Sequence, residues 1–73
     1  MTRQVLRMKL AILNKRNIDV ILELRKVGID VGEAQFSRAF SPTAREPKQD
    51  RIRRETEKII ATWEKRLKAS EAC

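Results

Sequence analysis

The chain has 73 residues, 41% of them hydrophobic and 37% charged, and it carries a formal net charge of +7. A chain this short forms a single domain, over residues 1–73, and buries only about 60% of its unfolded surface, so its core must be small. The composition is that of a folded, charged domain rather than a disordered one. No apolar run approaches the roughly 20 residues that span a bilayer, so no membrane-spanning helix is expected.

Enzymatic chemistry is not expected. The sequence has no histidine, a single cysteine at Cys73 and no glycine-rich phosphate loop. It therefore offers no nucleophile-and-base pair and no set of metal ligands, and its one thiol fits a reducing cytoplasm. We expect no catalytic residue, no metal, no cofactor and no small-molecule substrate.

The positive charge is unevenly distributed. Residues 1–17 give +5, whereas residues 18–42 sum to −1 and residues 43–73 to +3. Such a surface attracts polyanions, either a nucleic acid or an acidic membrane face. The bases of the N-terminal segment are Arg3, Arg7, Lys9, Lys15 and Arg16.

The first predicted helix begins at Arg3 and is interrupted by "NKRN" at 14–17. Two adjoining apolar stripes at helical spacing predict a wide buried face. Asn14 suits the C-terminal end of this helix, and Asn17 is expected to cap the next one by accepting a backbone N–H. The stripes are Val5, Met8 and Ile12, and Leu6, Leu10 and Leu13.

The second predicted helix begins near Ile18, in "IDVILELRKVG". Gly28 ends it, because glycine takes the left-handed conformation at little cost. The alternation in "VILEL" is also compatible with a strand, but no second strand is nearby to pair with it, so we prefer a helix. Most of this helix should be buried by its dense apolar residues, Ile18, Ile21, Leu22, Leu24 and Val27.

The third predicted helix spans about residues 31–41, and two start points compete. Asp30 with Glu33 forms a capping box, whereas Gly32 would give a shorter helix with Ile29 and Val31 anchoring the turn. Either start gives the same outward face. The helix must stop near Ser41, because the following proline disfavours helical geometry in the residue before it.

The fourth predicted helix is long and amphipathic, over about residues 48–69. Some 20 residues make a rod of about 30 Å, longer than three short helices need as a cover. Its far end, at Ile60, Trp63 and Leu67, is therefore predicted to contact a second copy or another partner. The expected fold is all-α, a small bundle of about four helices. The apolar stripe is Ile52, Thr56, Ile59, Ile60, Trp63 and Leu67.

The third predicted helix divides into two faces. Phe36, Ala39 and Phe40 recur at the spacing of one buried side. Arginine can bond guanine in two places, glutamine can do the same for adenine, and glutamate can accept from cytosine, so the other side is suited to reading DNA bases. That outer side holds Glu33, Ala34, Gln35, Ser37 and Arg38.

The stretch "FSRAFSP" at 36–42 resembles the end of the recognition helix in the Cro and phage-repressor-like helix-turn-helix family. Ser41-Pro42 stand where that family usually has Asn-Gly. The chain departs from the family in a turn about two residues longer before Phe36, and in one long helix where two short helices usually follow.

The resemblance implies a small transcriptional regulator of a phage or mobile element. Such a protein acts in the cytoplasm of a bacterial or phage-infected cell, as a homodimer on double-stranded DNA. Carried over, the base-contacting positions are Glu33, Ala34, Ser37 and Arg38, with Gln35 close by. Phosphate contacts would come from Asn17 and from Thr43, Arg45 and Lys48 in the loop after the recognition helix.

Other interpretations remain open. Phe36 and Phe40 would be core residues in any small bundle, and Trp63 is more typical of packing than of base stacking. The alternative function is a helical interaction or adaptor module that uses the long C-terminal helix, its basic charge being incidental. A membrane-surface or RNA-binding helix is a third reading, disfavoured by the mixture of acids and bases. Solvated charges are expected at Arg53, Arg54, Lys58, Lys65, Arg66 and Lys68.

Overall fold

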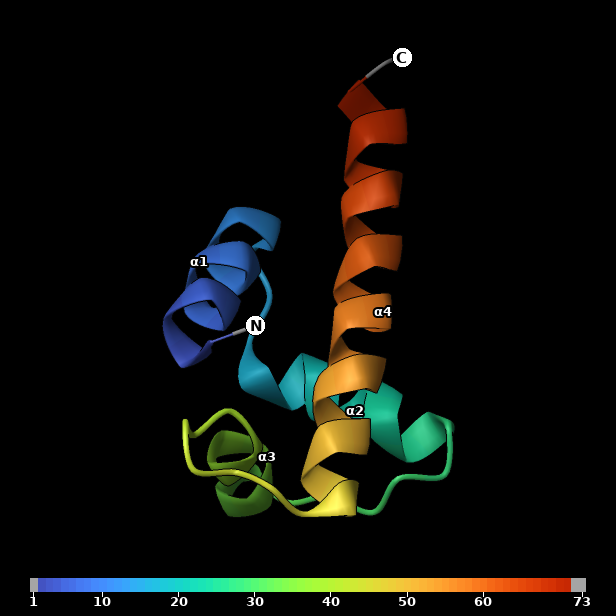
Figure 1. Ribbon diagram of the computed structural model, residues 1–73. Coiled ribbons are helices and arrows are strands. Elements are labelled where there is room, and N and C mark those ends of the chain that lie inside the picture. The colour runs from blue at the N-terminus through green and yellow to red at the C-terminus, as the bar shows by residue number, and fades with distance from the viewer. Residues whose placement is uncertain (1, 72–73) are drawn as a thin grey trace.

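The computed structural model describes residues 2–71, and these form four α-helices without a strand (Figure 1). The helices are α1 (Arg3–Leu13), α2 (Asn17–Lys26), α3 (Glu33–Ala39) and α4 (Pro47–Glu71). The predicted all-α fold with a long C-terminal helix is confirmed. Cys73 lies outside the described residues.

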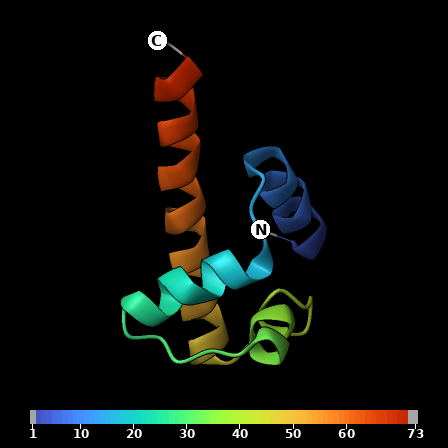
Figure 2. The same ribbon diagram turned by 180° about the vertical axis from the view of Figure 1, so that it is seen from behind.

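Helix α4 is the rod on which the other three helices pack. Helices α2 and α3 also contact each other and lie against the N-terminal half of α4, whereas α1 lies beside its C-terminal half (Figure 1). The view from behind shows α2 crossing α4 (Figure 2). The molecule measures 41 × 25 × 17 Å, so α4 extends along its whole length.

The hydrophobic core draws on every helix and on the turn between α2 and α3. Phe36 and Phe40 meet edge to face with ring centroids 5.2 Å apart, a preferred aromatic geometry. Thr56 is buried, and its hydroxyl donates to the carbonyl oxygen of Ile52 at 2.7 Å, which satisfies it. The buried apolar residues are Leu6, Leu10, Val20, Ile21, Leu24, Ile29, Val31, Phe36, Ala39, Phe40, Ile52 and Ile60.

The ends of α1 and α2 follow local rules, with one correction. Asn14 adopts the left-handed conformation (φ 56°) and Gly28 does so after α2 (φ 88°), as predicted. The prediction that Asn17 caps α2 is wrong, because Asn17 is the first helical residue. The carboxylate of Asp19 caps the helix instead, accepting the backbone N–H of Arg16 at 2.8 Å.

The start of α3 is settled in favour of Gly32. Its backbone N–H donates to the side-chain oxygen of Gln35 at 3.2 Å, and the buried Ile29 and Val31 anchor the turn before it. The helix is shorter than the predicted span of 31–41, because it ends at Ala39 with Phe40 as its C-cap. Helix α4 begins at Pro47, a residue that suits the first helical position.

The predicted wide buried face of α1 is only half correct. Leu6 and Leu10 are buried, but Val5, Met8 and Ile12 are 38%, 58% and 71% exposed. Helix α1 packs mainly on α4, so only one of its sides is covered. Helix α2 is likewise less buried than its sequence predicts, since Ile18, Leu22 and Val27 are exposed.

Candidate nucleic-acid interface

The outer side of α3 is a continuous exposed surface. Phe36 and Ala39 turn inward and are buried, because residues three apart share one side of a helix. All five residues predicted to read bases are exposed: Glu33, Ala34, Gln35, Ser37 and Arg38.

Gln35 already has a structural task. Its side-chain oxygen accepts the N–H of Gly32 at 3.2 Å and so caps α3. Bonding adenine in two places would require this oxygen, and losing a helix cap costs about 1 kcal/mol. Gln35 is therefore bound to the helix start in this structure, whereas Glu33 and Arg38 have no such bond to a cap.

Two arginines from other helices hold the C-terminal half of α3. The guanidinium of Arg3 donates to the carbonyl oxygen of Ser37 at 3.0 Å. That of Arg53 donates to the carbonyl oxygens of Ala39 at 3.0 Å and Ala44 at 3.3 Å. The last carbonyls of a helix have no partner within the helix, and positive charge is favourable there. These bonds therefore fix α3 against α1 and α4.

The prediction of Arg53 as a solvated charge is wrong. Its side chain is only 25% exposed and is partly buried between α4 and the loop after α3. The sequence contains no local signal for this role, because the bonded carbonyls lie 14 and 9 residues earlier.

Removing Arg53 should loosen α3. Arg53→Met keeps most of the side-chain volume but deletes two charge-assisted bonds to backbone carbonyls, so we expect a loss of about 1–3 kcal/mol in the free energy of unfolding. Arg54→Met is the matched control, because Arg54 is 75% exposed and pairs with Asp50 at 3.1 Å on the same helix. Urea denaturation of both variants measures the difference, and equal losses would contradict the role of Arg53.

Three predicted phosphate contacts lie beside Arg38, two of them in the loop after α3. The prediction that Lys48 also lies in this loop is wrong, because Lys48 is in the first turn of α4. Thr43 and Arg45 line one shallow hollow together with Arg38, and Lys48 lines an adjoining one with Arg38 and Gln35. The loop is ordered by the hydroxyls of Ser41 and Thr43, which are 3.0 Å apart.

Not every predicted contact belongs to this surface. Asn17 is exposed in the first turn of α2 but lines neither hollow. Among the N-terminal bases, Arg3 lies beside the loop after α3. Lys9 instead pairs with Glu64 at 3.5 Å, and the ammonium of Lys15 lies 5.2 Å from the centre of the Trp63 ring. Lys9 and Lys15 are thus directed towards α4.

The predicted partner contact at the far end of α4 needs correction. Ile60 is 1% exposed and belongs to the core, so the prediction that it meets a partner is wrong. Trp63 is partly buried and packs against the core. Of the three residues predicted to contact a partner, Leu67 alone is exposed, at 38%.

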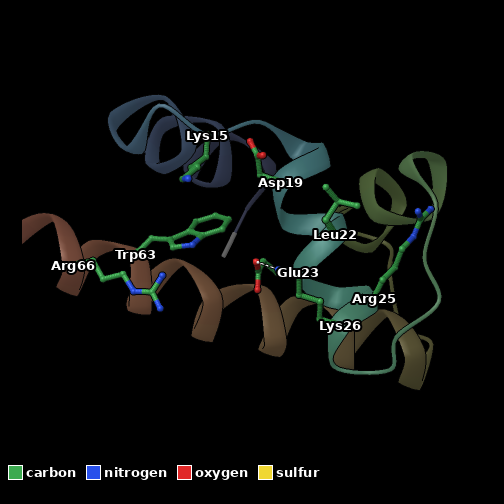
Figure 3. Close-up of a pocket in the computed structure, with 8 residues that line it drawn as sticks. All are labelled: Lys15, Asp19, Leu22, Glu23, Arg25, Lys26, Trp63 and Arg66. Carbon is green, nitrogen blue, oxygen red and sulfur yellow. Dashed lines mark hydrogen bonds and ion pairs between the residues drawn. The ribbon is translucent and has the colours of Figure 1, made fainter.

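The hollow around Trp63 carries mixed charge (Figure 3). Lys15 and Asp19 lie on one side of the indole ring, and Glu23 and Lys26 form an ion pair of 3.1 Å beside it. Arg25 points away, and its guanidinium donates to the carbonyl oxygen of Val31 at 3.4 Å. Because acidic and basic side chains alternate around it, this hollow does not favour a negatively charged ligand over a positively charged one.

Two further classes of site are absent from residues 2–71. No three histidine, cysteine, aspartate or glutamate side chains of this segment gather where they could hold a metal ion. None of its helices is long and apolar enough to cross a membrane.

Comparison with protein-family models, with curated proteins and with solved structures finds no match to this chain.

Proposed function

We propose that the chain is a small sequence-specific double-stranded DNA-binding protein that regulates transcription, with α3 inserted in the major groove. The observation that carries the proposal is the exposed polar side of α3, whose opposite side is fixed by Phe36, Arg3 and Arg53. A helix fits the major groove, and base edges there present a distinct donor and acceptor pattern for each pair.

Individual roles follow from side-chain chemistry. Arg38 can bond the guanine O6 and N7 atoms, Glu33 can accept from cytosine, and Ala34 can contact the methyl group of thymine. Ser37 suits a base or a phosphate. Gln35 can read a base only by giving up its bond to Gly32. Helix α2, which packs on α3, serves as the brace.

Phosphate contacts set the position of the protein on the duplex without reading sequence. Thr43, Arg45 and Lys48 are proposed for this role because they adjoin Arg38. Exposed Arg7 and Asn17 are proposed as further contacts from α1 and α2.

The resemblance of "FSRAFSP" to phage-repressor-like recognition helices supports the same function. It points to a homodimer on a palindromic operator in the cytoplasm of a bacterial or phage-infected cell. A second copy is also expected on physical grounds, because one short helix buries too little surface for strong selectivity.

Selection of bound duplexes from a random pool, followed by sequencing, tests the proposal. We expect enrichment of one short palindrome. A bound fraction as diverse as the starting pool would refute sequence-specific binding. It would leave the adaptor alternative, which the exposed aliphatic residues of α1 and Leu67 favour.

Arg38→Ala and Lys48→Ala should separate base reading from phosphate binding. Arg38→Ala is expected to weaken the preferred site by about 1–3 kcal/mol and to relax preference at one base pair. Lys48→Ala should weaken all sequences alike. Both residues are exposed, so thermal stability should hardly change. Selected-site profiles of the two variants give the comparison, and identical profiles would mean that Arg38 reads no base.

A further inference from the structure

An apolar surface joins α1 to the C-terminal half of α4. The stripe of Val5, Met8 and Ile12 on α1 leads to a groove whose other wall carries Leu67. In so charged a chain, four exposed aliphatic side chains in one region indicate a contact surface. We call this region the α1–α4 groove; it is lined by Lys9, Ile12, Leu13, Glu64, Leu67 and Lys68.

We propose that the α1–α4 groove binds the same groove of a second copy of this chain, an inference that rests on the proposed DNA-binding function for its choice of partner. The partner surface is therefore the stripe and Leu67 of the other copy. A two-fold axis produces such a contact, because it brings the same surface of each copy together.

The charges at the groove suit a second copy. Lys9 and Glu64 form an ion pair of 3.5 Å across it, and their side chains are 43% and 42% exposed, so both remain accessible. A second copy brings the same pair in reverse order, and Lys9 of each copy can then approach Glu64 of the other. Because the rim of the groove carries a positive and a negative side chain, the surface is electrostatically complementary to itself. A rim with charges of one sign would instead favour a partner of the opposite charge.

The position of the groove along α4 also fits two copies on DNA. The bond from Arg53 to Ala39 places the end of α3 beside Arg53 of α4, while the groove lies further along α4, at Glu64 to Lys68. These levels are 11 to 15 residues apart by the numbering. The separation along α4 is therefore about 16–22 Å.

A two-fold axis through the groove and perpendicular to α4 doubles this separation. The two copies of α3 then lie about 32–44 Å apart along that direction. The range includes the spacing of about 34 Å between successive major grooves on one side of the duplex. A dimer through the groove therefore lets both copies of α3 reach one palindrome.

Sedimentation equilibrium on the full chain without DNA tests the groove. The parent chain should dimerise, and Ile12→Glu or Leu67→Glu should raise the dissociation constant at least about tenfold by placing a carboxylate in an apolar contact. Val27→Glu is the matched control: Val27 is 51% exposed but follows α2 and does not line the groove. Circular dichroism should show the same helix content in all variants, because every substituted side chain is exposed.

Two results would overturn the inference. One is a parent chain that stays monomeric at high micromolar concentration, which would assign the groove to another partner. The other is a dimer that Val27→Glu dissociates as strongly as Ile12→Glu does.

Binding-site selection distinguishes this inference from the proposed function. A dimer sensitive to Ile12→Glu without any enriched sequence would support the groove and refute DNA reading. Enrichment of an isolated half-site, bound equally by the parent chain and Ile12→Glu, would support DNA reading and refute the groove. A palindrome with half-sites one helical turn apart, bound much more weakly by Ile12→Glu, supports both.

Discussion

Replacing Phe36 with alanine is expected to unfold the domain. Phe36 is one of the largest fully buried side chains and meets Phe40 edge to face. Truncation of a buried phenylalanine costs about 3–5 kcal/mol. Small domains have only about 5–15 kcal/mol of stability, and this chain should lie near the lower end because its core is small.

Urea denaturation followed by circular dichroism measures this loss, and Leu22→Ala is the control. Leu22 is 48% exposed and lies outside the α1–α4 groove, so the same kind of truncation should change the unfolding free energy by less than about 0.5 kcal/mol. Equal losses at the two positions would contradict the placement of Phe36 in the core.

Raising the salt concentration from about 50 to about 200 mM is expected to weaken operator binding about 10⁴-fold. Four cationic phosphate contacts in each copy, from the exposed Arg7, Arg45 and Lys48 and from Arg16 beside Asn17, make eight in a dimer. Counterion release then gives a slope of log affinity against log salt near −7, since each neutralised phosphate contributes about −0.9.

A matched pair of variants tests which cations contribute. Lys48→Ala removes one contact from each copy and should reduce the magnitude of the slope by about 2. Lys58→Ala should leave it unchanged, because Lys58 pairs with Glu55 at 3.4 Å and lines neither hollow beside Arg38. Titrations at several salt concentrations give the slopes, and a nearly flat dependence for the parent chain would favour the adaptor alternative.

Features set by neighbouring residues were predictable from the sequence. Asn14 and Gly28 end their helices in the left-handed conformation because their own backbones favour it, and the apolar stripe of α4 recurs at helical spacing from Ile52 to Leu67. The choice between Gly32 and Asp30 as the start of α3 was open, because both starts offer a partner three residues on. The bond from Gly32 to Gln35 decides it.

Features set by distant residues were not predictable. Helical spacing made both stripes of α1 equally suited to burial, and only the position of α4 determines that Leu6 is covered and Ile12 is not. The burial of Ile60 has the same cause. The bonds of Arg3 and Arg53 to the backbone of α3 join residues 34 and 14 positions apart, which no local pattern encodes.

The shortness of α3 has a consequence for the thermodynamics of binding. Seven residues make about two turns, and an isolated helix of this length is not stable in water. Phe36 in the core keeps α3 folded, so α3 cannot open without exposing that core. The amide hydrogens of its C-terminal half, from Phe36 onward, should therefore be protected from exchange by close to the global free energy of unfolding. DNA binding then requires no coupled folding of α3. The heat-capacity change of binding should therefore reflect only the protein and DNA surface that is buried in the complex.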